Sequence, residues 1–378
     1  AVSPGKVVWQ SELIQLIQYE PSTAQVHKRP LLIVPPWINK FYILDLKPQN
    51  SFIKWAVEQG LTVFVISWVN PDQRLADKSF DDYMTEGIYA AMDGIKAACG
   101  EDEVNIIGYC LGGTLTGATL AHMAAHDDDR IKSVTFFTSL VDFTVPGELA
   151  IFIDDEQLGQ LEEKMQEQGG ILDGASMATT FNLLRSNDLI WSFVINNYLM
   201  GKDPFPFDLL YWNSDSTRMP GVMHSFYLRN MYQKNLLSQP GGIEMCGTPI
   251  DLRDVKIPVH IISTKEDHIA PWKGTYVATQ LYSGETTFTL AGSGHIAGIV
   301  NPPTAQKYGY WSNPENPADP DDWFAGATQS EGSWWPQWGK WIARQSGSKV
   351  KARTPGSKDA PVLEDAPGSY VKVRSDDG

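Results

Sequence analysis

The sequence is poor in cysteine and lacks long apolar runs. Its three cysteines, Cys99, Cys110 and Cys246, are too few and too scattered for a disulfide scaffold, and no C-x-x-C pair suggests a zinc site. Such sparse cysteine is typical of a reducing compartment. The longest apolar stretches, such as 61–69, are far shorter than the roughly 20 residues of a transmembrane helix, and no signal peptide is visible. We therefore expect a cytoplasmic protein without a metal site or a transmembrane segment.

Basic residues are also in deficit. Lysine and arginine number 30 against 45 aspartates and glutamates, which gives a formal net charge of −15. Proteins that bind nucleic acids neutralise phosphates with clustered Lys and Arg, so this composition argues against a nucleic-acid partner. An anionic substrate is still possible, because it needs only a local basic patch. With 378 residues and 42% hydrophobic content, we expect one large domain with an insertion, or two domains.

Apolar runs alternate with helical patterns in the first part of the chain. Strands are expected at 30–36, 61–68, 103–109 and 131–140, and helices at 51–59, from 79 to about 98, and at 112–126. This alternation predicts βαβ units and a mainly parallel sheet. Two earlier alternating stretches, 6–10 and 13–19, suit edge strands.

The alternation breaks after residue 142. Residues 143–254 are rich in aromatic side chains and turn formers, with helices expected at 155–167 and 188–199, and we interpret them as a cap inserted over the carboxyl edge of the sheet. The sheet then resumes with strands at 257–264 and 286–290. The expected organisation is a core formed by 1–142 and 255–346, the cap, and an extended arm or disordered tail at 347–378. Four tryptophans in the expected last helix, Trp334, Trp335, Trp338 and Trp341, favour packing over function.

A glycine-rich stretch places Cys110 between an apolar run and the start of an expected helix. Gly108, Cys110 and Gly112 fit G-x-C-x-G, the cysteine form of the sharp strand-to-helix turn that presents the nucleophile of α/β-hydrolases. At a helix N-terminus, the dipole and free amides favour thiolate over thiol. Taken alone, the pattern is equally compatible with a small buried cysteine.

Two later residues follow Cys110 in the order in which α/β-hydrolases carry nucleophile, acid and histidine. Asp267 and His295 each lie in a loop directly after an expected strand. We predict that Cys110 attacks an acyl carbon, that His295 takes its proton, and that Asp267 orients the imidazole. Asp142 also ends a strand and is an alternative acid.

The predicted chemistry also needs donors for an oxyanion. The backbone amide of Leu111, with that of Trp37 or Ile38 after the strand at 30–36, is expected to supply them. A cysteine nucleophile keeps the bound acyl group as a thioester. An enzyme that must pass the acyl group to a hydroxyl has reason to use it, whereas a simple hydrolase has less.

Several segments resemble the catalytic domain of class I polyhydroxyalkanoate synthases. They read VPPWINKFYILDL (34–46), GYCLGGT (108–114), NDLIW (187–191), FDLLYWN (207–213), EDHI (266–269) and GSGHIAGIVNPP (292–303). The match covers nearly the whole chain, and these motifs are much more specific than G-x-C-x-G alone. The resemblance implies an α/β-hydrolase fold with a mobile cap over a buried site.

The resemblance also implies an activity. Members of the family polymerise (R)-3-hydroxyacyl-CoA, such as 3-hydroxybutyryl-CoA, into polyester, with the growing chain held on cysteine and coenzyme A released, so no separate cofactor is expected. The family roles fall on Cys110 as nucleophile, His295 as base and Asp267 as acid, for which activation of the incoming hydroxyl is also proposed. The family works as a homodimer at the surface of polyester granules in the cytoplasm.

The resemblance suggests contacts with the substrate or coenzyme A for a few further residues. Arg185, Trp212 and His268 are candidates, with packing as the alternative for Trp212 and a surface position as the alternative for His268. Two departures are expected: this sequence lacks the family's additional N-terminal domain, and it has Trp37 where many relatives have cysteine. Two alternatives stay open, a cysteine hydrolase resembling dienelactone hydrolases and a non-catalytic granule-coating protein.

Overall fold

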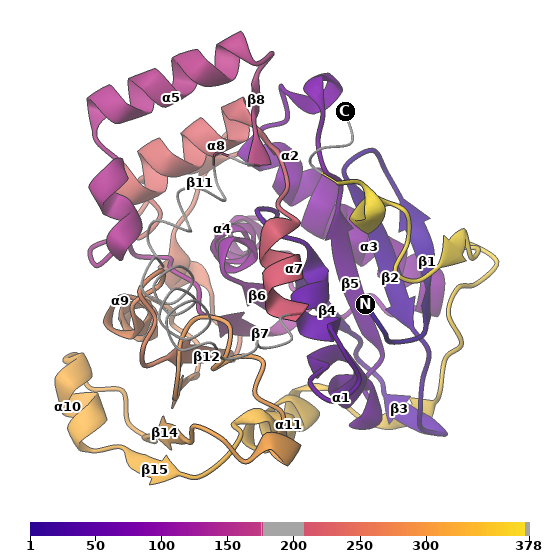
Figure 1. The fold of residues 1–378 in the computed structure, drawn as a ribbon. Helices are drawn as coiled ribbons and strands as arrows, with labels where there is room; N and C mark the ends of the chain where they lie inside the picture. The colour runs from indigo at the N-terminus through magenta and orange to yellow at the C-terminus, as the bar shows by residue number, and fades with distance from the viewer. Residues whose placement is uncertain (175, 177–207, 375–378) are drawn as a thin grey trace, which may run out of the picture.

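The computed structural model describes residues 1–174, 176 and 208–374. Their central feature is an 11-stranded sheet in the order β15-β14-β13-β12-β7-β6-β4-β5-β2-β1-β17 (Figure 1). The strands in chain order are β1 (Gly5–Gln10), β2 (Ile14–Tyr19), β4 (Leu31–Val34), β5 (Val63–Trp68), β6 (Val104–Tyr109), β7 (Ile131–Phe137), β12 (Val259–Thr264), β13 (Thr286–Ala291), β14 (Tyr310–Ser312), β15 (Thr328–Ser330) and β17 (Glu364–Asp365).

The centre of the sheet is parallel. The strands β13, β12, β7, β6, β4 and β5 pair in parallel, and the flanking strands β14, β15, β2, β1 and β17 are antiparallel. The predicted parallel sheet is therefore confirmed. Because β6, β12 and β13 run in the same direction, the loops that follow them meet at one edge of the sheet.

Helices cover both faces. On one face lie α3 (Ala90–Cys99) and α4 (Leu111–Ala125), and on the other lie α1 (Phe52–Glu58) and α11 (Trp335–Gln345). Neighbouring residues of one strand point to opposite cores, as Ile106 does toward the α4 side and Ile107 toward the α11 side. This double coverage explains why the parallel strands are continuous apolar runs in the sequence.

Residues 143–254 carry short helices beyond the carboxyl edge of the sheet. Their described elements include α5 (Asp155–Glu167), α7 (Asp208–Ser214), α8 (Gly221–Tyr227) and the pair β8 (Ile171–Leu172) and β9 (Met219–Pro220) (Figure 1). The helix predicted at 155–167 is confirmed with the same bounds. The helix predicted at 188–199 lies outside the described residues. Within the described part of the chain, no helix has both the length and the apolar character to cross a membrane.

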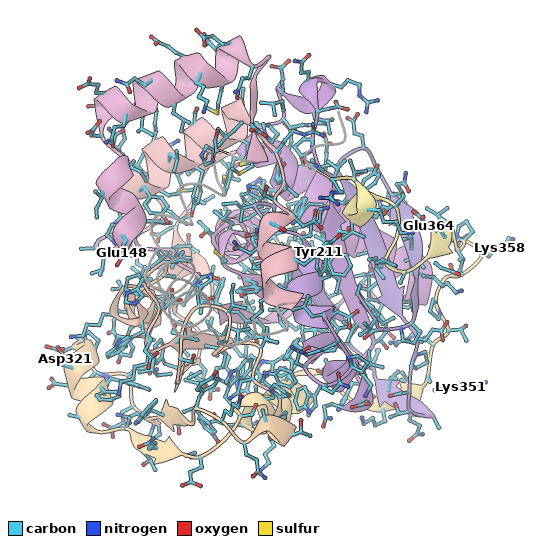
Figure 2. All side chains as sticks on the ribbon, viewed as in Figure 1. Glu148, Tyr211, Asp321, Lys351, Lys358 and Glu364 are labelled. Carbon is cyan, nitrogen blue, oxygen red and sulfur yellow. The ribbon has the colours of Figure 1, made fainter. Side chains whose placement is uncertain are left out.

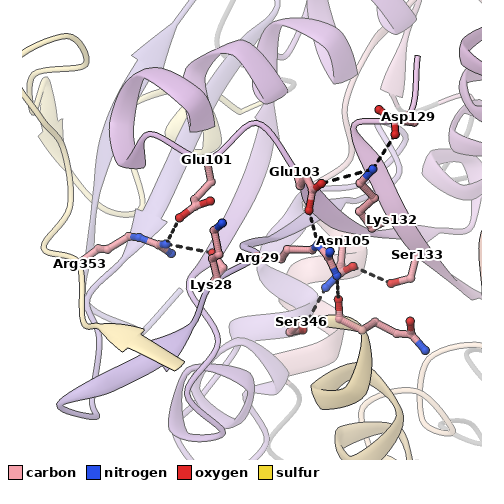
Figure 3. Close-up of polar contacts among 11 residues, drawn as sticks. Lys28, Arg29, Glu101, Glu103, Asn105, Asp129, Lys132, Ser133, Ser346 and Arg353 are labelled. Atoms are coloured by element: carbon pink, nitrogen blue, oxygen red, sulfur yellow. Dashed lines mark hydrogen bonds and ion pairs between the residues drawn. The ribbon is translucent and has the colours of Figure 1, made fainter. Parts of the chain in front are cut away.

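Residues 347–374 of the C-terminal arm lie along the core. Its β16 (Lys349–Lys351) pairs with β3 (Gln25–His27), and β17 pairs with β1. The side chain of Arg353 donates to Glu101 at 2.6 Å, and a buried network links Asn105 to Ser346 (Figure 3). Residues 6–10 and 13–19 form strands as predicted, but the expected edge position is wrong, because β2 lies between β5 and β1 and the arm pairs with β1.

Candidate active site

Cys110 occupies a strained turn between β6 and α4. Its backbone has φ 52° and ψ −120°, a conformation that a non-glycine residue adopts only when its surroundings impose it. The half-buried residue donates its backbone N–H to the carbonyl of Phe137 at 2.9 Å. The predicted strand-to-helix turn is confirmed, with the side chain at the N-terminus of α4.

The glycines around Cys110 make room for this turn. A Cβ at Gly112 would meet the carbonyl oxygen of Val34, and a Cβ at Gly113 would meet the side chain of Ser139. At Gly108 a Cβ would meet Gly113 itself. The turn therefore depends on close backbone contacts that larger residues exclude.

His295 and Asp267 meet at the same edge of the sheet. The Nδ1 atom of His295 lies 2.7 Å from Oδ2 of Asp267, which orients the other ring nitrogen away from the carboxylate. Oδ1 of Asp267 accepts the backbone N–H groups of Ile269 and Ala270, both at 2.9 Å. Thr264 donates its hydroxyl to Oδ2 at 3.2 Å. The Asp267 side chain is fully buried and that of His295 is 10% exposed, so the pair is held in low dielectric.

The electrostatics of His295 favour its charged form. Burial by itself would lower the pKa of the imidazole, but the carboxylate of Asp267 and the sulfur of Cys110 outweigh burial and raise the pKa of His295 to about 10. The ring of Tyr109 also stacks on the imidazole with centroids 5.9 Å apart. The pKa of His295 therefore responds to both Asp267 and Cys110.

The expected oxyanion donors follow Cys110 and β4 in the chain. Leu111 is the first residue of α4, where backbone N–H groups have no partner within the helix. Trp37 and Ile38 follow β4 and are buried, and their carbonyls are held by Thr217 of the inserted region. Because Gly112 lies against the end of β4, the two backbone segments approach each other closely.

The alternative acid is engaged elsewhere. Asp142 accepts the backbone N–H of Thr144 at 2.8 Å and the side-chain amide of Asn235 at 3.1 Å. Burial alone would raise the pKa of Asp142, but these hydrogen bonds lower it below its usual range. The structure therefore pairs His295 with Asp267 and not with Asp142.

The three residues expected to contact substrate have different surroundings. The side chain of His268 is 68% exposed, and its Nδ1 atom lies 3.9 Å from Oε1 of Glu148. Glu148 lies on the outer surface (Figure 2). Trp212 is buried and donates its indole N–H to the carbonyl of Lys40 at 2.7 Å, which favours the packing alternative. Its neighbour Tyr211 is exposed (Figure 2). Arg185 lies outside the described residues.

No described group of three or more His, Cys, Asp or Glu side chains has the arrangement of a metal site.

Comparison with known proteins identifies the family. Residues 1–56 match a family model described as Poly-beta-hydroxybutyrate polymerase (PhaC) N-terminus, and residues 30–302 match the alpha/beta hydrolase fold. A poly(3-hydroxyalkanoate) polymerase subunit PhaC of Rhizobium meliloti (strain 1021) is 55% identical over 99% of this chain and 61% of that protein. Poly(3-hydroxyalkanoate) polymerase 2 of Ectopseudomonas oleovorans is 42% identical over 99% of this chain and 67% of its own length. The chain belongs to the poly(3-hydroxyalkanoate) polymerase family.

The matches cover different fractions of the related proteins' lengths. The chain spans less than two thirds of the length of the Rhizobium meliloti polymerase. Among solved structures, a monoacylglycerol lipase of Paleococcus ferrophilus is similar with a TM-score of 0.47 and 14% identity, over 88% of this chain and 97% of the lipase.

The sequence patterns did not indicate two tyrosines that lie near Cys110 in this polymerase-family chain. Tyr227 ends α8 and Tyr232 follows it, with their rings 5.6 Å apart. Burial is the main cause that raises the pKa of both hydroxyls, and the neighbouring Cys110 raises them further. Both residues come from the inserted region, where no periodic pattern indicated which side chains face the core.

Proposed function

We propose that this chain carries the catalytic centre of an acyltransferase that polymerises (R)-3-hydroxyacyl-CoA into polyester. The observation that carries the proposal is the contact of His295 with Asp267, beside a cysteine in a nucleophile turn. Membership of the polymerase family points to acyl-CoA as the substrate. Coenzyme A is then part of the substrate and the product, and no separate cofactor takes part.

The proposed first step loads the enzyme. His295 takes the proton from Cys110, the thiolate attacks the thioester carbonyl, and backbone amides of Leu111 and of Trp37 or Ile38 stabilise the oxyanion. The C–S bond to coenzyme A then breaks, and His295 returns the proton to the leaving thiolate. The acyl group is now a thioester on Cys110 with no loss of activation.

The proposed second step forms the ester. The 3-hydroxyl of another substrate attacks the acyl-cysteine, its proton moves to His295, and Cys110 leaves as thiolate. The lengthened acyl-CoA then reacylates Cys110 and releases coenzyme A. The complete burial of the Asp267 side chain supports a role that acts through His295, because both carboxylate oxygens already accept hydrogen bonds.

The test is to incubate the protein with (R)-3-hydroxybutyryl-CoA while following free thiol and turbidity. We expect both signals to rise together, and Cys110→Ser to reduce thiol release by about 10³-fold or more with an unchanged far-UV spectrum. Thiol release without insoluble polyester would instead indicate a hydrolase. No signal in either channel would contradict both enzymatic functions and favour a granule-coating role.

The proposal includes the setting of the reaction. Family resemblance extends it to a homodimer acting in the cytoplasm at the granule surface. Light scattering at several protein concentrations would test the dimer, and cosedimentation with isolated granules would test the surface.

A further inference from the structure

Two tryptophans from the far end of the chain hold the loop that carries His295. The indole N–H of Trp334 donates to the carbonyl of Gly298 at 2.8 Å, and that of Trp335 donates to the carbonyl of Ile299 at 2.9 Å. Both side chains are 1% exposed, so these bonds are shielded from water. A buried carbonyl that loses its donor is costly to leave unpaired.

The anchored carbonyls belong to the same tight turn as the base. The backbone N–H of Gly298 donates to the carbonyl of Gly294 at 2.9 Å. This hydrogen bond closes a turn that contains His295. On its other side, Gly298 lies so close to Thr264 that a Cβ would collide with the threonine side chain. Thr264 in turn donates to Asp267. The turn is therefore held between the tryptophans and the strand that supports the acid.

Trp334 also contacts Phe137, the residue whose carbonyl holds the backbone of Cys110. Its ring packs on Phe137 with centroids 5.2 Å apart. The carbonyl of Phe137 accepts the backbone N–H of Cys110. One buried side chain thus contacts the supports of both the nucleophile and the base, although it reaches neither reacting atom.

We propose that Trp334, assisted by Trp335, is a positioning residue that sets the distance between the His295 imidazole and the Cys110 sulfur. The proposal rests on the proposed function, because it requires His295 to act on Cys110. Displacement of a catalytic group by even an ångström reduces turnover strongly, so one lost anchor has a measurable effect.

The same helix offers a matched control. Trp338 donates its indole N–H to the hydroxyl of Thr135 in β7 at 2.9 Å and is also fully buried. Trp334→Phe and Trp338→Phe therefore each remove one buried indole N–H from α11, but only the first frees a carbonyl of the His295 turn.

The experiment compares the two variants with the unsubstituted chain. It measures kcat and KM for coenzyme A release from (R)-3-hydroxybutyryl-CoA, the pH profile of Cys110 alkylation by iodoacetamide, and the thermal midpoint. We expect Trp334→Phe to reduce kcat about tenfold at unchanged KM and to move the alkylation profile to higher pH. Trp338→Phe should lower the thermal midpoint comparably and leave kcat and the profile unchanged.

The outcomes separate two kinds of failure. If Trp334→Phe and Trp338→Phe change kcat and the alkylation profile equally, or if Trp334→Phe changes neither, the positioning role is wrong. Failure of the proposed function would give a different result. The unsubstituted chain would release no coenzyme A, and the pH profile of Cys110 alkylation would be the same in His295→Gln as in the unsubstituted chain.

Discussion

The turn at 108–113 carries the proposed nucleophile Cys110, and the turn at 292–300 carries the proposed base His295; we call them the nucleophile turn and the base turn. They are held in position by different kinds of contact. In the first, Cys110 is held by glycines that let the turn lie against Val34 and Ser139. In the second, His295 is held by partners far along the chain, namely Asp267, Tyr109 and the tryptophans of α11. The Cys110 turn is fixed mainly by close backbone contacts at its glycines, and the His295 turn mainly by side-chain hydrogen bonds.

This difference predicts different failures. Substitutions in the nucleophile turn should produce clashes and damage stability, because a Cβ has no space there. Substitutions around the base turn should change reactivity more than folding, because the chain can still close while the imidazole shifts.

The largest effect is expected from the acid. Asp267→Asn should reduce kcat by about 10³-fold, because an amide cannot support the imidazolium charge or fix its tautomer. The measurement is coenzyme A release at saturating substrate. Asp142→Asn is the matched control and should stay within about twofold of the unsubstituted chain. An equal loss in the two variants would contradict the pairing of Asp267 with His295.

A large stability effect is expected in the nucleophile turn. Gly113→Ala should lower the free energy of unfolding by about 3 kcal/mol, because its Cβ would meet the Ser139 side chain. Gly159→Ala in α5 is the control, since nothing lies within 4 Å of its added Cβ, and it should stabilise the chain by about 0.5–1 kcal/mol. Denaturant titration compares them, and a neutral Gly113→Ala would show that the turn is not sterically fixed.

The raised pKa of His295 in the base turn should make the free energy of unfolding depend on pH. Because the pKa of His295 is raised from 6.5 to about 10 in the folded chain, its charged form stabilises the fold fully below pH 6.5, and this contribution is lost as the pH rises through 10. Relative to His295→Gln, the unsubstituted chain should lose about 3–4 kcal/mol between pH 7 and pH 10. Parallel curves for the two proteins would refute the raised pKa.

The smallest effect is expected from the support of the acid. Thr264→Val removes one donor from Asp267 and leaves its two backbone donors in place. We expect about a threefold decrease in kcat, with the alkaline limb of the pH–rate profile at higher pH, because a carboxylate with one donor fewer holds the imidazolium more strongly. Thr264→Ser retains the hydroxyl and should restore both values. A loss as large as that of Asp267→Asn would mean that the threonine orients the whole loop.

Much of the site could be predicted because its signals are local or ordered along the chain. The glycine pattern around Cys110 reflects direct backbone contacts, and the strand preceding each functional residue is a short apolar run. The order of Cys110, Asp267 and His295 then follows from the topology of the parallel sheet. By contrast, Tyr227 and Tyr232 come from an aromatic region without clear periodicity, so their approach to Cys110 had no sequence signal.

The sequence alone determined the nucleophile turn, the parallel core and the family resemblance, since glycine spacing, apolar runs and motifs are properties of neighbouring residues. Only the tertiary structure decided that His295 meets Asp267 and not Asp142, and that Trp334 and Trp335 anchor the base turn. It also decided that the C-terminal arm covers β1. The reason is physical: the glycines that permit a strand-to-helix turn are neighbours in the sequence, whereas these contacts join residues tens to hundreds of positions apart and exist only when the sheet brings its loops together.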